Sequence, residues 1–426
     1  MPKGAIIALY VLGAVAMVGL VKLLVFFSTA ADTAQRTDMQ EPVPAELLRV
    51  LVIHSQWLYI ICNFVAVPWP STLSVPMQVI SGIWSSTSGS SVGLECVLSR
   101  GTGLPVAVQK VLIALFTPVG ILCAVLLIEV LLHYLRPNKS ARAGHDFAGL
   151  VMCIVFMFMP TWVHTALSLF ACVPLDTPVQ WPHQAASIGS YWVEDMAQLC
   201  YSRAGYHRGW ALGLGIPLTF VLCAVLPAAA FCFMWISRKR GKLDDPQFQK
   251  HYSFMYRLWA ERVCWYESVV LLQTIALVIV STFGFVMGPY YSSLVTAAVL
   301  VVIATLLLVV KPFKCPTANK IAVVSVYVLF TTAYAALTFL SFNNAGPGPI
   351  YGNIMGVVIL ISNLAFFVGV IWKLVKVVDW AAIRAFFSKG CCSANKGVGG
   401  RPRASGGPGF LASLVGIVKR KQPTST

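Results

Sequence analysis

Residues 238–320 decide the fold. They open with the basic run RKRGK at 238–242, and positions 267–314 read ESVVLLQTIALVIVSTFGFVMGPYYSSLVTAAVLVVIATLLLVVKPFK. Two apolar blocks, 264–287 and 292–310, contain no Lys or Arg and are joined only by a short turn, 288–291. Each block of about 20 residues would rise about 30 Å as a helix, the thickness of a bilayer's hydrocarbon core. Basic residues flank the outer ends of the pair and none lies at the turn, so the stretch predicts a transmembrane hairpin with both ends in the cytoplasm.

The composition of the whole chain indicates the same class of protein. Of 426 residues, 58% are hydrophobic and 11% are charged, whereas a soluble domain carries about 25% charged residues. The basic residues give a net charge of +16 and cluster between apolar blocks. In that position they act as topology determinants and as contacts to anionic membrane lipid, and nucleic acid is not an expected partner. We therefore predict an all-α, polytopic membrane helix bundle.

The number of spans depends on the block 47–67, whose 21 residues include Arg49, His54, Gln56 and Asn63. One interpretation is an interfacial helix, and the other is a span whose polar residues face neighbouring helices. The first block, 4–27, is either a cleaved signal peptide or a retained span, and its long apolar core favours retention. If both blocks cross the membrane there are nine spans, which we prefer because more basic residues then lie inside; otherwise there are eight. The remaining predicted spans are 108–133, 147–171, 210–236, the hairpin, 321–341 and 353–372.

Three regions follow from this order. Residues 1–46 form the first span and a polar linker, residues 47–375 form the multi-span domain, and residues 376–426 form a basic amphipathic and disordered tail. On the side of the 238–242 run, 23 basic residues flank the spans, against 4 on the opposite side counted from position 68 onward. This asymmetry predicts a cytoplasmic carboxyl terminus in an integral membrane protein.

The cysteines fall into two candidate sites and a background of small buried hydrophobes. Cys172 and Cys200 lie in a long loop that the charge pattern places outside the cytoplasm, where they either pair or remain free thiols. We predict the disulfide, whose loop of about 28 residues would contribute on the order of 3–4 kcal/mol. Cys391 and Cys392 follow the basic amphipathic segment, a setting typical of S-palmitoylation.

Four polar residues inside or at the ends of apolar blocks are the intramembrane candidates. Glu129 and His133 lie four residues apart, and they either handle ions or protons or extend from the cytoplasmic end of their span to water. His164 is either a titrating sensor or a neutral imidazole bonded to a carbonyl freed by Pro160. Glu267 is expected to form an interfacial ion pair with Arg262.

The catalytic and cofactor motifs that are readable from sequence are missing. The chain contains no Walker loop, no HExxH, no GxSxG and no CxxC metal spacing. We therefore expect no enzyme activity, no metal site and no cofactor.

Four motifs, taken in order, resemble a known family. They are His54-Ser55-Gln56 followed by Trp69-Pro70; Cys172, the segment 190–195, Cys200 and His207; Tyr256 through Trp265-Tyr266-Glu267; and Lys311-Pro312-Phe313 with Asn319. Together they resemble the carboxyl-terminal membrane region of large cysteine-rich surface proteins of green algae and ciliates, which is similar to TRP-like and polycystin-like membrane domains. The resemblance covers most of 45–375. The chain departs from the family at Leu272-Gln273, where an Arg-Lys pair is usual, and after Asn319, where an acidic residue is usual.

The resemblance implies a TRP-like ion channel or a channel-derived membrane sensor, in the plasma or ciliary membrane. The short turn 288–291 and the turn 341–352 leave no room near the carboxyl end for a pore helix with a filter. Two alternatives therefore stay open, a non-conducting receptor or scaffold and a lipid or solute transporter, although no internal repeat supports a transporter. Membrane lipids and a second copy of the chain are the candidate partners.

Overall fold

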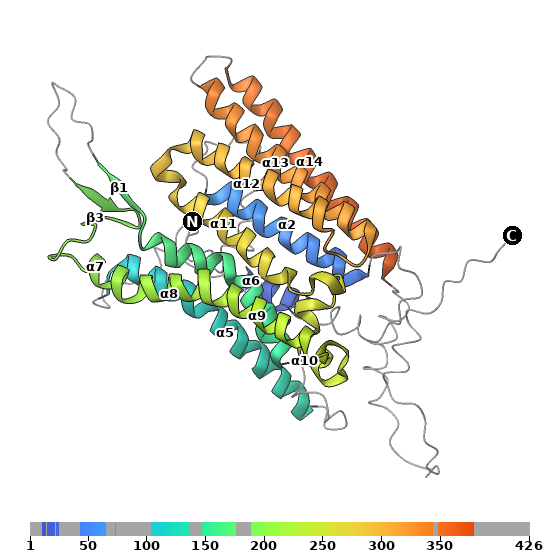
Figure 1. The fold of residues 1–426 in the computed structure, drawn as a ribbon. Coiled ribbons are helices and arrows are strands. Elements are labelled where there is room, and N and C mark those ends of the chain that lie inside the picture. The colour runs from blue at the N-terminus through green and yellow to red at the C-terminus, as the bar shows by residue number, and fades with distance from the viewer. Residues whose placement is uncertain are drawn as a thin grey trace, which may run out of the picture.

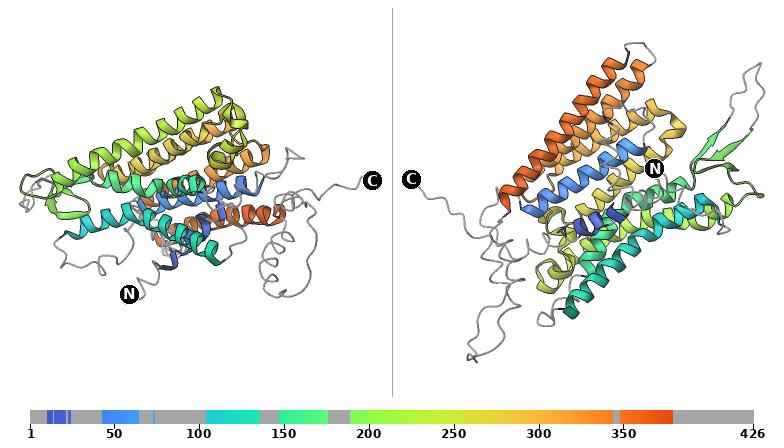
Figure 2. Two further views of the ribbon diagram at one scale, coloured as in Figure 1. Left: turned by 90° about the horizontal axis from the view of Figure 1, so that it is seen from below. Right: turned by 180° about the vertical axis from the view of Figure 1, so that it is seen from behind.

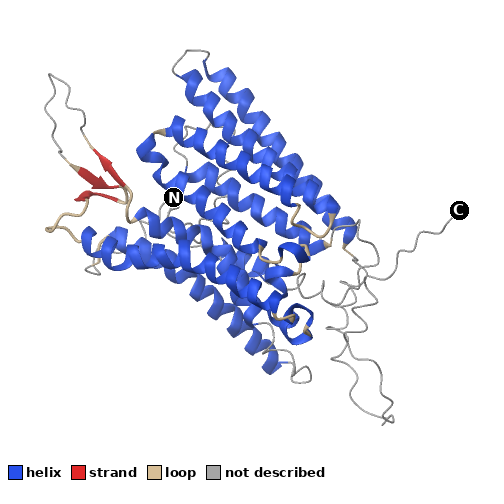
Figure 3. Cartoon of the chain, in the orientation of Figure 1, coloured by secondary structure: helices blue, strands red, loops and turns tan. Residues whose placement is uncertain are grey.

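The chain folds as an all-α polytopic helix bundle (Figure 1 and Figure 3). The computed structural model describes residues 11–13, 15–21, 23–24, 43–64, 73, 104–135, 147–175, 189–343 and 348–378. Within these ranges, 8 helices are long and apolar enough to cross a membrane. The block 4–27 is described only in part, as a short apolar helix over Val11–Val21, so the ninth predicted span lies largely outside the described residues.

The predicted hairpin is confirmed. Helix α11 (Tyr266–Met287) and helix α12 (Pro289–Val310) are separated by Gly288 alone. Gly288 has φ 85°, a backbone conformation open mainly to glycine, and Pro289 then starts α12 with its ring already set for a helix. The two helices approach closely at their joined ends, because a Cβ built on Gly284 would lie 2.7 Å from the Cβ of Ser292.

The helices alternate in direction between two ends of the bundle. The basic end holds the carboxyl end of α9, helix α10 and the start of α11, and the disulfide end holds a small sheet (Figure 1). The other long helices run between these ends with bounds close to those predicted. They are α2 (Pro44–Phe64), α5 (Val106–Leu135), α6 (Phe147–Ser168), α13 (Pro316–Asn343) and α14 (Gly348–Val377).

The predicted span 210–236 is a composite helix with two π turns. It runs through α7 (His207–Trp210), η3 (Ala211–Gly215), α8 (Ile216–Phe220), η4 (Val221–Val225) and α9 (Leu226–Lys239). Each π turn ends two residues before a proline, Pro217 or Pro227. A proline cannot donate to the carbonyl four residues earlier and its ring clashes with it, and the wider turn makes room for that ring.

The basic end is completed by short elements between α9 and α11. They are η5 (Lys242–Asp244), α10 (Pro246–Tyr256) and η6 (Glu261–Val263). Helix α10 packs against α6. It also contacts α9, because the ring of Phe233 in α9 packs against the rings of Phe248 and Tyr252 in α10. The phenol of Tyr256 donates to the carbonyl of Leu243 at 2.9 Å, and burial raises the pKa of Tyr256 to about 12.

The disulfide end carries a three-stranded antiparallel sheet that the sequence did not predict. Its strands are β1 (Cys172–Pro174), β2 (Ser190–Trp192) and β3 (Asp195–Leu199), in the order β1-β2-β3. Cys172 pairs with Trp192 in the register of the first two strands. The sheet projects from the bundle beside the start of α7 (Figure 1), and we call it, with residues 200–207, the disulfide lobe.

Helix α2 runs through the middle of the bundle (Figure 2). It contacts α11, α13 and α14, and 83% of its apolar window is buried, against 11% for the composite helix. An interfacial helix would expose one polar face to water. The interpretation of 47–67 as an interfacial helix is therefore wrong, and α2 is a core helix whose polar residues face other helices.

Candidate functional site

Helix α2 connects its neighbours through four polar side chains, which with their partners we call the α2 polar network. They are Arg49, His54, Gln56 and Trp57, and each is at most 3% exposed. Arg49 and Trp57 bond to α11, and Gln56 bonds to α6. His54 bonds to both α13 and α14. The indole Nε1 of Trp57 donates to Oγ1 of Thr274 at 3.0 Å. Since a polar group in an apolar bundle is stable only when it is bonded, these contacts fix the rotation of α2 about its axis.

The charged part of the network is an ion pair between Arg49 and Glu267, whose side chains are 1% and 6% exposed. Nη2 of Arg49 donates to Oε1 of Glu267, and Nε1 of Trp259 donates to Oε2 of the same carboxylate at 3.3 Å. Residue 49 lies in the second turn of α2 and Glu267 in the first turn of α11, so the pair lies toward the basic end.

The predicted partner of Glu267 was therefore wrong. Arg262 precedes α11 in the turn η6, and its Nη2 donates instead to the carbonyl of Val310 at 2.5 Å. Nη1 of Arg238 in turn donates to the carbonyl of Arg262 at 2.8 Å. These arginines satisfy carbonyls that helix ends leave free, whereas the buried carboxylate draws its cation from α2.

Two phenylalanine rings enclose the guanidinium of Arg49. Its Cζ lies 3.5 Å from the ring centroid of Phe156 in α6 and 4.4 Å from that of Phe254 in α10. Such cation–π contacts stabilise a desolvated guanidinium by about 2 kcal/mol or more. Nε and Nη1 of Arg49 have no hydrogen-bond partner among the described residues. The aromatic faces thus provide much of the electrostatic compensation that water would give.

Gln56 donates to a carbonyl group that a proline leaves without a hydrogen-bond donor in α6. Pro160 has no N–H, so the carbonyl of Phe156, four residues earlier, loses its helical donor. Nε2 of Gln56 lies 3.4 Å from that carbonyl and 3.1 Å from the carbonyl of Met157. The residue found at this carbonyl is Gln56, while the candidate His164 is half-buried one turn further along α6.

His54 joins three helices. Its Nδ1 lies 2.9 Å from Oγ of Ser325 in α13, and its Nε2 lies 3.3 Å from Oδ1 of Asn363 in α14. Nδ2 of Asn363 donates onward to Oγ1 of Thr332 at 3.0 Å. Phe366 stacks on the imidazole with the ring centroids 4.2 Å apart. Because Asn363 Oδ1 can only accept, Nε2 of His54 carries a hydrogen.

Two loops at the basic end contact each other: the loop that precedes α11 and the loop between α12 and α13. The amide of Ala260 donates to the carbonyl of Pro312 at 2.7 Å, and the ring of Trp259 lies 4.8 Å from that of Phe313. Asn319 at the start of α13 closes the second loop: its Oδ1 accepts from the amide of Phe313 at 3.0 Å, and its Nδ2 donates to that residue's carbonyl at 2.8 Å. Two of the motifs noted in the sequence thus meet in space.

A cavity of about 30 Å³ lies among α2, α11, α12 and α13. Its walls are mainly apolar, and its polar lining includes Tyr266, Gln273 and Ser325. Nε2 of Gln273 lies 3.4 Å from the hydroxyl of Tyr266, and Ser325 also bonds His54. The space is about as large as one water molecule, but its lining is mostly apolar, so it adds no polar link to the network.

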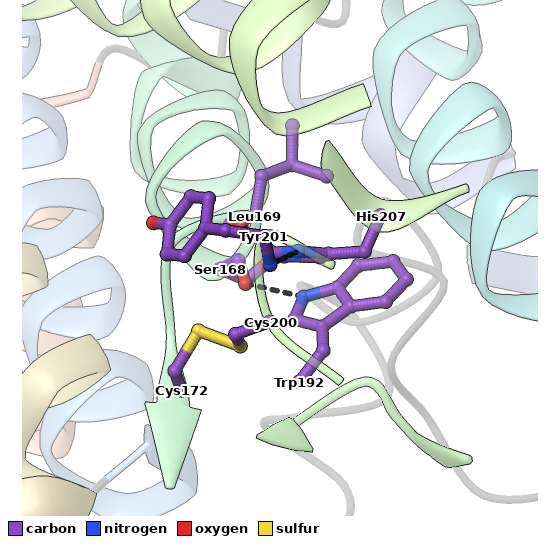
Figure 4. The surroundings of a disulfide bond; sticks show 7 residues. All are labelled: Ser168, Leu169, Cys172, Trp192, Cys200, Tyr201 and His207. Atoms are coloured by element: carbon purple, nitrogen blue, oxygen red, sulfur yellow. Dashed lines mark hydrogen bonds between the residues drawn. A yellow bond between two sulfur atoms is a disulfide. The ribbon is translucent and has the colours of Figure 1, made fainter. Parts of the chain in front are cut away.

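The disulfide predicted between Cys172 and Cys200 is present (Figure 4). Behind it, Nε1 of the fully buried Trp192 donates to the carbonyl of Ser168 at 2.8 Å, so the lobe is hydrogen-bonded to the end of α6. The hydroxyl of Tyr206 donates to Oδ2 of Asp195. Burial and this hydrogen bond raise the pKa of Tyr206 above its usual value.

Other predicted site residues are not assembled by the described part of the chain. Glu129 and His133 lie in the last turns of α5, but their side chains are outside the described residues. Cys391 and Cys392 also lie outside them. Sequence reasoning noted Arg49, His54 and Gln56 without selecting them as sites; the available signal was their occurrence within an otherwise apolar block.

The chain matches no known family model, no curated protein and no solved structure. The fold and the buried network define a class, a multi-pass membrane helix bundle with a polar network inside its apolar core.

Proposed function

We propose that the protein is a TRP-like, channel-derived membrane protein that conducts cations or senses the bilayer. The observation that carries the proposal is the charged and polar axis along α2, formed by Arg49, His54 and Gln56 in the middle of the bundle. Ionisable residues inside a membrane bundle are costly and mark ion pathways, proton relays or switching elements. A purely structural helix could pack at the same place with aliphatic side chains alone.

The proposed orientation places the basic end in the cytoplasm of a plasma or ciliary membrane. Described basic residues at that end include Arg238, Lys239, Arg240 and Lys242. The ammonium of Lys239 lies 5.4 Å from the ring of Trp235, a pairing typical of the membrane interface. Anionic lipid of the cytoplasmic leaflet is the proposed partner of this surface.

A non-conducting receptor is the second candidate, and two observations favour it. The link between α11 and α12 is the single residue Gly288, so no pore helix fits between them. The disulfide lobe is a folded unit on the proposed outer side, as a ligand-reading surface would be. A conducting path would instead run along the α2 network within the bundle.

Currents from the purified full chain in a planar bilayer test the proposal across voltage, tension and calcium. We expect cation-selective currents that change in Glu267→Gln, because this change removes the acidic member of the buried pair. The matched control is Thr305→Ala, whose exposed hydroxyl on α12 donates to the carbonyl of Val301 in the same helix, at 2.9 Å. Silence of the wild-type protein under all conditions would reject conduction and favour the receptor.

A further inference from the structure

The disulfide lobe contains a group of metal-ligand types that the α2 polar network does not use. The sulfur atoms of Cys172 and Cys200 and a ring nitrogen of His207 all lie within 4.8 Å of one another (Figure 4). His207 is fully buried and the two cysteines are partly buried. Two thiolates and one imidazole form a ligand set that suits Zn²⁺. In the structure the two sulfurs are bonded to each other, so this set is available only after reduction.

His207 is already oriented as a ligand. Its Nε2 lies 2.9 Å from the carbonyl of Leu169 and donates to it, while its Nδ1 accepts from the amide of Tyr201 at 3.2 Å. A metal-bound histidine almost always donates its other N–H to a carbonyl or carboxylate, which fixes the tautomer and orients the ring. The ring of Trp192, with its centroid 5.1 Å away, restricts further rotation. The lone pair on Nδ1 is therefore held in place by contacts that do not involve the cysteines.

The group that occupies this lone pair is the amide of the residue next to Cys200. Tyr201 has φ 58°, one of two non-glycine residues with positive φ in the described part of the chain. This left-handed conformation is unfavourable for a residue with a Cβ, and here the disulfide and the bond to Nδ1 hold it. A metal ion at Nδ1 must displace this amide, and cleavage of the adjacent disulfide removes one of the two restraints on Tyr201.

We propose that the reduced protein binds Zn²⁺ through the thiolates of Cys172 and Cys200 and Nδ1 of His207, with water as the fourth ligand. A dithiol reductant supplies two electrons and two protons to the Cys172–Cys200 bond, which yields two thiols, and the reductant becomes its own cyclic disulfide. The metal ion then displaces the two thiol protons, which pass to solvent, and takes the Nδ1 lone pair. The lobe thus closes either by a disulfide or by a metal ion.

Cobalt(II) provides the probe, because thiolate coordination to Co²⁺ gives charge-transfer absorption and Co²⁺ takes tetrahedral zinc sites. The full chain in detergent is reduced with a dithiol, freed of reductant without air, and titrated with Co²⁺ and then with Zn²⁺. We expect one equivalent of Co²⁺ with thiolate bands that Zn²⁺ abolishes, and no such bands before reduction. The double variant Cys172→Ser/Cys200→Ser keeps every other thiol, and it should lose the bands.

The histidine ligand is tested separately. His207→Gln should weaken Co²⁺ binding by tenfold or more while the two thiolates remain, whereas His164→Gln, which changes a histidine outside the cluster, should leave it unchanged. Bands that persist in the double serine variant would place the metal on other cysteines and overturn the proposal. Unchanged affinity in His207→Gln would also overturn the proposal. The absence of bands in the reduced protein would overturn it as well, whether the ligands have separated or the lobe has unfolded.

Discussion

Arg49 and Glu267 are 218 positions apart in the chain and form one ion pair inside the bundle. The pair joins the central helix α2 to the first helix of the hairpin. Trp259 and two phenylalanine rings complete its surroundings, and these come from α6, α10 and the loop that precedes α11. Five segments thus meet at this buried ion pair, and variants of the pair test how they are placed relative to one another.

Removal of one charge should destabilise the bundle more than removal of both. Arg49→Met or Glu267→Leu alone leaves a buried group without its partner, and each should lower the free energy of unfolding by about 3–5 kcal/mol. The double variant Arg49→Met/Glu267→Leu should recover most of that loss. Thermal unfolding in one detergent measures all three proteins. Arg262→Gln, at the exposed arginine first expected to pair with Glu267, loses only its hydrogen bond to the carbonyl of Val310 and should cost about 1 kcal/mol. Strictly additive losses in the pair would contradict the assignment.

The contribution of Gln56 to the stability of the protein should depend on Pro160. Gln56→Leu leaves the carbonyl of Phe156 without a donor, which should destabilise the protein by about 1–3 kcal/mol. In the Pro160→Ala background the alanine N–H can bond that carbonyl along the helix, so the same substitution should have a smaller effect. A double-mutant cycle of unfolding measurements gives the coupling. Equal effects of Gln56→Leu in both backgrounds would show that the side chain does not act through this carbonyl.

The close approach of α11 and α12 makes Gly284 a sensitive position. Gly284→Ala places a methyl group against Oγ and Cβ of Ser292. Overpacking of this kind should lower the free energy of unfolding by about 1–3 kcal/mol. Ser292→Gly in the same chain should relieve the clash. Gly369→Ala is the control, because among the described residues no atom outside its own helical turn lies within 4 Å of the added carbon. If the two alanine variants melt at the same temperature, the helices do not pack as described.

Loss of the disulfide should loosen the lobe and leave the bundle intact. The bond closes a loop with a sequence separation of 28, and its removal should cost about 3–4 kcal/mol of local stability. In Cys172→Ser/Cys200→Ser, amide hydrogens of β2 and β3 should exchange faster, while those of α2 and α11 keep their protection. Mass spectrometry of the exchanged full chain provides the comparison. Uniform deprotection of both regions would mean that the lobe and the bundle unfold together.

The sequence was sufficient for the span pattern because each span is a local property. The hairpin and most helix bounds follow from apolar length and from the basic flanks, which need no knowledge of neighbours. The turn was predicted over 288–291, whereas α12 already begins at Pro289, so the link is Gly288 alone. The disulfide followed from two cysteines on one side of the membrane. Even the inclusion of α2 in the core was one of two interpretations that its polar residues allowed.

Pairings between distant segments could not be read in the same way. Glu267 has a basic residue five positions earlier, Arg262, so local spacing favoured that partner over Arg49. The bond from Gln56 to the carbonyl freed by Pro160 depends on the packing of α2 against α6, which one sequence does not encode in any short pattern. The small sheet was also missed, since its strands have 3, 3 and 5 residues and lack a clear alternation.

The proposed orientation places the basic end and the disulfide end on opposite sides of a membrane. An epitope inserted between Trp181 and Trp192, and a second inserted after Asp245, test this most directly in cells with intact or permeabilised membranes. We predict that antibody reaches the first epitope in intact cells and the second only after permeabilisation. Access to the second epitope alone in intact cells would reverse the orientation, and access to both would contradict a bundle that spans the membrane.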